Sequence, residues 1–67
     1  MELKHNSLFV ARAQKGYSID QLSEKSNVSS QTISRIESGT ITPRATTIGK
    51  LAAALEISIP DLLKGAE

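Results

Sequence analysis

Residues 17–39 read YSIDQLSEKSNVSSQTISRIESG, and this stretch decides how the chain of 67 residues folds. Ser18 opens a Ser-x-x-Gln capping box, which satisfies two unpaired backbone donors at the start of a helix. Ser29 is a candidate cap for a second helix, and Gly39 follows that helix where a left-handed residue commonly ends one. Asn27 lies between the two helices and accepts a positive φ more readily than most residues. The pattern therefore predicts two short helices joined by a sharp turn.

The aliphatic residues of this stretch fit two helices that cross and bury their contact. Ile33 and Ile36 are three residues apart, a spacing that places both side chains on one face of a helix. Leu22 and Val28 are the apolar residues of the preceding helix and of the turn. We expect these four side chains to be buried.

Signals before and after this stretch predict three further helices. Asn6 or Ser7 is placed to cap a helix that stops at Gly16. Pro43 is tolerated in the first turn of a helix, and Ser58 starts another capping-box-like pattern. The sequence has no strand pattern, repeat or linker. We therefore expect one all-α domain over residues 1–67, with its central motif at about 18–39 and helices at about 7–15, 18–25, 29–38, 44–55 and 58–64.

The fourth expected helix has an apolar face with one irregularity. Ile48, Leu51, Ala52 and Leu55 follow helical spacing and are expected in the core. Gly49 lies inside this helix, where glycine costs about 1 kcal/mol relative to alanine. Two explanations remain for Gly49, namely close packing against a neighbour or a neutral choice.

The composition indicates a small soluble domain with an aliphatic core. Hydrophobic residues make up 39% of the chain, but only one Tyr and one Phe are present. The chain has no cysteine, so a disulfide and a thiolate metal site are excluded, which fits a reducing compartment. No stretch has the length of a transmembrane helix or the character of a signal peptide. We expect a cytoplasmic protein with no membrane partner, cofactor, metal or small-molecule ligand.

The net charge is only +1, but it is distributed unevenly. Charges balance over residues 1–24, whereas residues 25–50 carry four cations against Glu37 alone and residues 51–67 carry one cation against three carboxylates. Taken alone, this surplus is typical of ordinary solvated surface. Its position, in the second half of the central motif and just after it, is where a DNA-binding face would lie.

The chain carries, in order, the elements Arg12-x-x-Lys15-Gly16-Tyr17-Ser18, Leu22-Ser23-x-x-x-Asn27-Val28-Ser29-x-x-x-Ile33-Ser34, Glu37-x-Gly39-x-x-x-Pro43 and Leu51-Ala52-x-Ala54-Leu55-x-Ile57. In their order and spacing these elements resemble the XRE-like helix-turn-helix family, which includes the Cro and CI phage repressors. The resemblance implies a compact five-helix lambda-repressor-like fold with the helix-turn-helix formed by helices 2 and 3. It also implies a sequence-specific regulator of transcription, a repressor, that binds double-stranded DNA at a palindromic operator as a homodimer.

The second helix of such a motif presents its N-terminal residues to base edges in the major groove. Ser30, Gln31, Ser34 and Arg35 are the base-reading candidates. Gln31 can pair with adenine and Arg35 with guanine, and each pair discriminates against a wrong base by about 1–3 kcal/mol. The alternative is that Gln31 is solvated and Arg35 pairs with a carboxylate.

The DNA backbone is expected to contact helix-start amides and polar side chains around the motif. The resemblance places Thr40, Thr42 and Arg44 on the backbone, with Ser38 as a further candidate. Alternatively, Ser29 only caps its helix and both threonines only form the loop. The complete set of backbone candidates is Lys15, Ser18, Ser29, Thr32, Ser38, Thr40, Thr42 and Arg44.

Ile19 departs from the family pattern. The resembling repressors often carry a phosphate-binding glutamine at this position, and isoleucine cannot make that bond. We expect the contact to be absent, or to be replaced by amides near Ser18 or by Lys15.

Two further roles are implied by the resemblance. Arg12 and Glu37 match a largely buried ion pair that ties the first helix to the third. Subunits of the resembling repressors pair at the start of the last helix, which makes Ile59, Pro60 and Leu63 candidates for a dimer interface. Phe9 is a fourth interface candidate because it falls off the core face of the first helix, and the alternative is that it folds back to fill the core.

Other classes of function remain as alternatives. An enzyme is not expected, because His5 is the only imidazole and no nucleophile lies beside a carboxylate pair or a glycine-rich loop. A DNA-binding antitoxin of a toxin-antitoxin pair would carry the same motif. A helical protein-protein adaptor of the same fold is the other alternative, since a fold does not fix a function.

Overall fold

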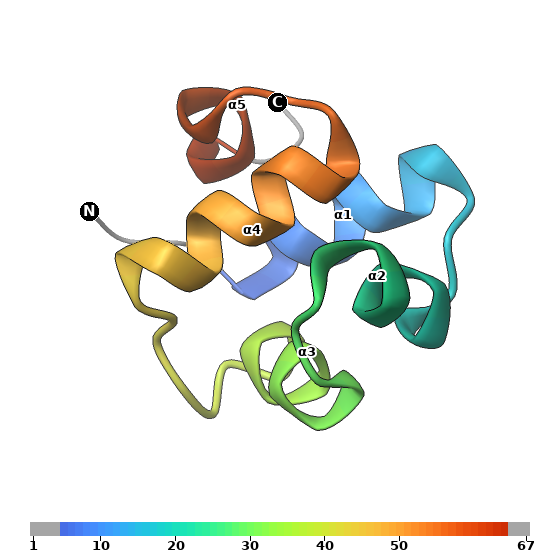
Figure 1. Ribbon diagram of the computed structural model, residues 1–67. Helices are drawn as coiled ribbons and strands as arrows, with labels where there is room; N and C mark the ends of the chain where they lie inside the picture. The colour runs from blue at the N-terminus through green and yellow to red at the C-terminus, as the bar shows by residue number, and fades with distance from the viewer. Residues whose placement is uncertain (1–4, 65–67) are drawn as a thin grey trace.

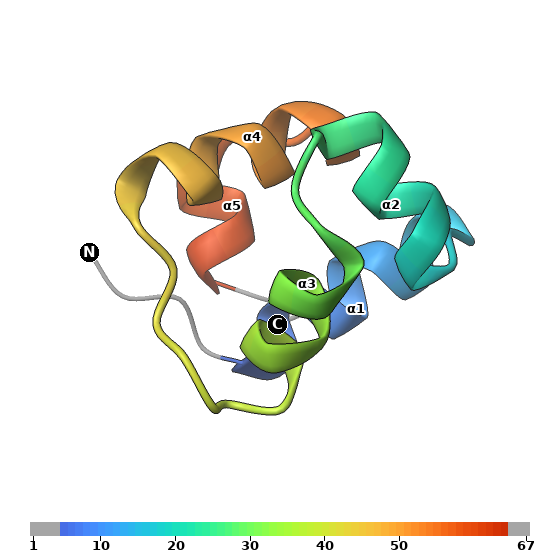
Figure 2. The ribbon, with the colours of Figure 1, turned by 60° about the horizontal axis from the view of Figure 1, so that its bottom comes forward.

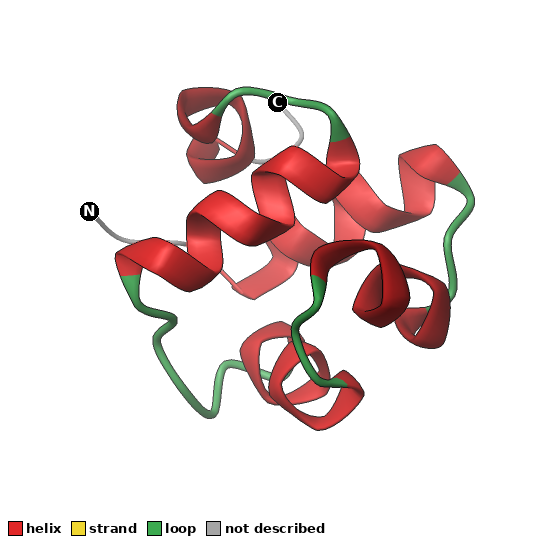
Figure 3. Ribbon diagram, viewed as in Figure 1, coloured by secondary structure: helices red, strands yellow, loops and turns green. Residues whose placement is uncertain are grey.

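Five α-helices account for most of residues 5–64, the part of the chain that the computed structural model describes (Figure 1). These residues contain helices and loops but no strand (Figure 3). The expected all-α architecture, with a helix-turn-helix formed by the second and third helices, is therefore confirmed. The helices are α1 His5–Lys15, α2 Ile19–Ser26, α3 Ser30–Glu37, α4 Ala45–Leu55 and α5 Ile59–Lys64.

Helices α1 and α4 connect the end of the molecule that holds α5 to the end that holds α2 and α3 (Figure 1). α1 contacts α3, α4 and α5, while α2 packs against both α3 and α4. Figure 1 shows α5 and α3 at opposite ends of this arrangement, and Figure 2 shows the long loop that joins α3 to α4. α3 therefore lies at one edge of the molecule, with one side held by α1 and α2.

The start of α2 has the cap that the sequence predicts. The Ser18 hydroxyl accepts a hydrogen bond from the Gln21 amide at 3.1 Å, and the Ser18 amide donates to Gln21 Oε1 at 2.8 Å. α2 ends at Asn27, which has the expected left-handed conformation with φ of 62°. These two features fix the length of α2 and the direction of the turn.

α1, α3 and α4 each end near a left-handed residue, where two successive backbone amides donate to carbonyl oxygens of the last helical turn. After α3, Gly39 has φ of 80°, and the amides of Gly39 and Thr40 donate to carbonyl oxygens of the last helical turn. Gly16 closes α1 in the same way. Glu56 closes α4 with φ of 59°, although a glutamate gives no sequence signal for this conformation.

The core is aliphatic, as the composition predicts, and the residues expected in it are buried. The observed core residues come from all five helices and from the turn, so the packing of each helix depends on the others. The buried apolar residues are Leu8, Leu22, Val28, Ile33, Ile36, Ile48, Leu51, Ala52, Leu55 and Leu62.

Two local expectations need correction. α1 begins at His5, so Asn6 and Ser7 lie inside the helix and the expected cap at either of them is wrong. Ser7 is 2% exposed beside Leu8, which shows that packing places it in the core-facing part of the helix. At Gly49, an added Cβ would meet nothing within 4 Å in the part of the chain that the structure describes, so close packing does not explain this glycine.

Candidate nucleic-acid interface

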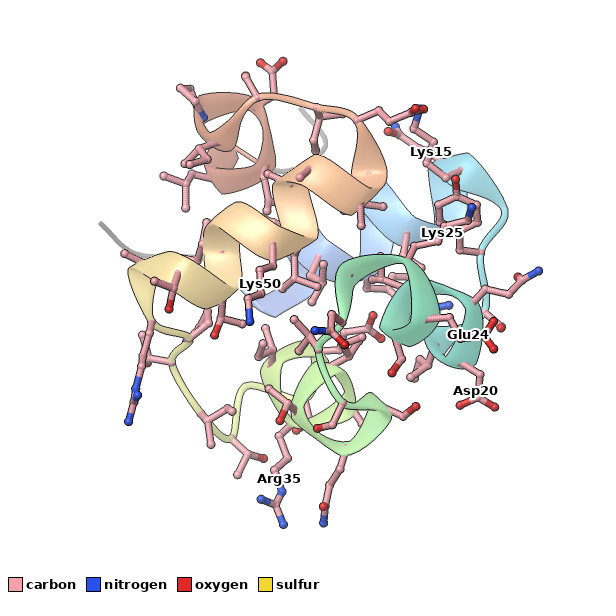
Figure 4. All side chains as sticks on the ribbon, viewed as in Figure 1. Lys15, Asp20, Glu24, Lys25, Arg35 and Lys50 are labelled. Atoms are coloured by element: carbon pink, nitrogen blue, oxygen red, sulfur yellow. The ribbon has the colours of Figure 1, made fainter. Side chains whose placement is uncertain are left out.

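The outward face of α3 carries three of the four base-reading candidates. Gln31, Ser34 and Arg35 are exposed and follow the spacing of one helix face, whereas Ile33 and Ile36 on the other face are buried. Arg35 points away from the molecule (Figure 4). Because α3 buries its aliphatic face in the core, its opposite face presents polar side chains with amide and guanidinium donors to solvent.

Two hydrogen bonds join Ser29 and Thr32 at the start of α3. The Ser29 hydroxyl accepts from the Thr32 amide at 3.1 Å and donates to Thr32 Oγ1 at 2.8 Å. The Ser29 hydroxyl proton is therefore used in a hydrogen bond within the protein, which favours the capping role over a phosphate contact. Thr32 accepts that bond, and its own hydroxyl proton has no acceptor among residues 5–64.

Ser30 is held by a residue that the sequence analysis missed. Its hydroxyl donates to Asp20 Oδ1 on α2 at 2.9 Å. Ser30 is half-buried and Asp20 is exposed. The two residues are ten positions apart on different helices, so no local spacing pattern could have indicated this bond.

Ser38 and Thr40 are linked where α3 meets the following loop. Ser38 Oγ donates to the Arg35 carbonyl at 3.0 Å and lies 2.7 Å from Thr40 Oγ1. Because a carbonyl oxygen only accepts, Thr40 supplies the proton for the second bond. Both hydroxyl protons are therefore used in hydrogen bonds that stabilise the start of the loop. Thr42 and Arg44, further along the loop, are exposed. Arg44 precedes α4 and makes no side-chain cap bond with that helix.

Lys15 lies outside this region, contrary to its selection as a backbone candidate. Its Nζ is 3.8 Å from Glu56 Oε1 at the end of α4. Figure 4 shows Lys15 at the opposite end of the molecule from Arg35. Ile19 is half-buried against the core, and the Ser18 amide already donates to Gln21. The structure therefore brings neither Lys15 nor a free Ser18 amide to the place of the missing glutamine.

Arg12 and Glu37 form a bidentate ion pair that joins α1 to the end of α3. Arg12 Nε and Nη2 donate to the two carboxylate oxygens of Glu37 at 2.7 and 3.0 Å. Arg12 Nη1 donates to the Tyr17 carbonyl at 2.9 Å, so the same guanidinium also holds the entry to α2. The two side chains are 14% and 10% exposed, and the hydrogen bond that Arg12 donates to Glu37 raises the pKa of Arg12.

The candidate residues for a dimer interface lie on α1 and α5. Phe9 is 51% exposed, and its ring centroid is 5.4 Å from the Arg12 guanidinium carbon, so the alternative that Phe9 fills the core is wrong. Pro60 is exposed, while Ile59 and Leu63 are half-buried against the core. α5 lies away from α3 in Figure 1, so the three candidates on α5 lie away from the outward face of α3.

Residues 5–64 offer neither a group of side chains suited to hold a metal ion nor a helix long and apolar enough to cross a membrane. The arrangement instead consists of an exposed polar helix face flanked by hydroxyl groups and Arg44. Such a face can donate to and accept from base edges and phosphates.

Comparison with known proteins agrees with this geometry. A search of curated proteins gives no match. One similar solved structure is the crystal structure of a hypothetical transcription factor, NHTF, from Neisseria, with a TM-score of 0.73 and 22% sequence identity. The alignment covers 94% of this chain and 80% of that one, and at this identity the likeness concerns the fold. The model of the helix-turn-helix family HTH_3 matches residues 10–62, which include the whole motif. The chain therefore belongs to this family of XRE and Cro/CI-type DNA-binding transcription regulators.

Proposed function

We propose that the protein is a transcriptional repressor that binds a palindromic operator in double-stranded DNA as a homodimer. The observation that carries this proposal is the outward face of α3, where polar side chains are exposed opposite a buried aliphatic face. In this role α3 enters the major groove and reads base edges through Ser30, Gln31, Ser34 and Arg35. Occupation of the operator is sufficient for repression, because it excludes other proteins from the same DNA.

Phosphate contacts flank this face in the proposed complex. Thr32 has an uncommitted hydroxyl proton, and Thr42 and Arg44 are exposed in the loop that leads to α4. Ser38 and Thr40 contact phosphate only by exchanging the hydrogen bonds that now hold the loop. Arg44 is therefore the strongest electrostatic anchor of the set.

The short length of α3 supports binding as a dimer. Eight residues of helix are about 12 Å long, which covers only a few base pairs. Two copies on half-sites about 34 Å apart double the sequence that is read. The proposed interface uses the exposed parts of Ile59, Pro60, Leu63 and Phe9.

A salt titration with sedimentation tests this proposal. Binding to duplex DNA should weaken steeply as salt rises, because neutralised phosphates release counterions. Sedimentation with a palindromic duplex should give two chains per duplex. A protein-protein adaptor would instead show no duplex binding, and a complex with one chain per duplex throughout would refute the dimer.

A further inference from the structure

The hydrogen bond between Ser30 and Asp20 joins the two helices of the motif beside the outward face of α3. Ser30 is the first residue of α3, and its hydroxyl oxygen lies 2.9 Å from Asp20 Oδ1. The Asp20 carboxylate is exposed in the first turn of α2, where a negative charge is favoured by the helix dipole. Figure 4 shows Asp20 and Glu24 on the same side of α2.

The chemistry of this bond fixes what Ser30 can do outside the protein. A carboxylate only accepts hydrogen bonds, whereas a serine hydroxyl has one proton and two lone pairs. The proton of Ser30 is therefore committed to Asp20, and only lone pairs remain for another partner. A serine hydroxyl without such a neighbour could either donate a hydrogen bond to a base edge or accept one from it. It would therefore not distinguish a base that presents a donor from a base that presents an acceptor.

In the major groove, adenine and cytosine present amino donors, while guanine and thymine present acceptors at the equivalent positions. We propose that Asp20 is a specificity-determining residue that makes Ser30 an obligate acceptor and so selects adenine or cytosine at the base that Ser30 faces. This inference rests on the proposed function. It also explains why an acidic side chain is compatible with a DNA-binding motif, because the charge that repels phosphate serves to orient Ser30.

Asp20→Asn tests the inference with little change of shape. The asparagine amide can both accept from and donate to Ser30, so the hydroxyl proton is no longer committed to one direction. The matched control is Glu24→Gln, which removes the same charge one helical turn further along α2. Ser30→Ala removes the proposed acceptor itself. It is a second variant that should change the preference at the same base pair as Asp20→Asn.

The assay is selection of bound duplexes from a random pool, carried out in parallel for the wild-type protein and the three variants. Asp20→Asn should lower the preference for an amino-bearing base about fivefold at one base pair in each half-site, the effect of a single hydrogen bond. Ser30→Ala should lose preference at that same base pair. Glu24→Gln should keep the wild-type preferences, and both charge-removing variants should bind more tightly overall.

The outcomes separate this inference from the proposed function. If Asp20→Asn selects the wild-type sequence at every position, or loses preference evenly across the site, the inference is overturned while DNA binding stands. If the wild-type protein enriches no sequence, the proposed function fails and the inference fails with it.

Discussion

Removal of the Glu37 carboxylate should destabilise the fold far more than it changes base preference. Glu37→Ala leaves the Arg12 guanidinium without two of its three hydrogen bonds, at a site where the side chain is 14% exposed. Removing one partner of a buried ion pair costs about 3–5 kcal/mol, and we expect about 3 kcal/mol because Arg12 keeps its bond to the Tyr17 carbonyl. A domain of this size has a free energy of unfolding of about 3–10 kcal/mol, so the loss is a large fraction of the total.

Thermal melts followed by circular dichroism measure this effect. For a domain of this length, a loss of 3 kcal/mol lowers the Tm by about 12–24 °C. Glu37→Gln keeps one acceptor for Arg12 and should fall between the wild type and Glu37→Ala. Lys15→Ala breaks the exposed 3.8 Å contact with Glu56 and should cost less than about 0.5 kcal/mol. An unchanged Tm for Glu37→Ala would refute the view that this pair holds α1 to α3.

Three further substitutions test other parts of the account. Gly49→Ala should raise the free energy of unfolding by about 1 kcal/mol in urea titrations, since a Cβ meets nothing within 4 Å, and a loss of stability would contradict the open environment. Glu56→Gly should stabilise by about 0.5–1 kcal/mol in the same assay, because glycine accepts the φ of 59° without strain; no gain would show that the helix end is unstrained. Arg44→Ala should weaken DNA binding evenly across sequences and reduce the slope of the salt dependence by about 1, whereas altered base preference would place Arg44 at base edges.

Features set by neighbouring residues could be predicted from the sequence. The capping box at Ser18, the left-handed Asn27 and the glycine at the end of α3 each act within one helical turn, so a short pattern is enough to indicate them. The core positions could also be predicted, because helical spacing shows which side chains share a face. The spacing of Gln31, Ser34 and Arg35 likewise places them on the face opposite Ile33.

Features set by contacts between helices could not be predicted from local patterns, and the Arg12–Glu37 ion pair was expected only because of the family resemblance. The Asp20–Ser30 bond depends on how α2 and α3 cross, and Lys15 was selected from its place in the sequence although α1 carries it away from α3. The cap expected at Asn6 or Ser7 failed because the packing of α1 extends the helix beyond the local signal. Glu56 shows the same limit, since the end of α4 takes a left-handed conformation without the residue that normally marks it.

Selection of duplexes from a random pool, with the wild-type protein at physiological salt, shows whether the outward face of α3 reads base sequence in duplex DNA. We expect a palindromic consensus with two half-sites about one helical turn, 34 Å, apart. A pool that remains unenriched after selection would contradict it.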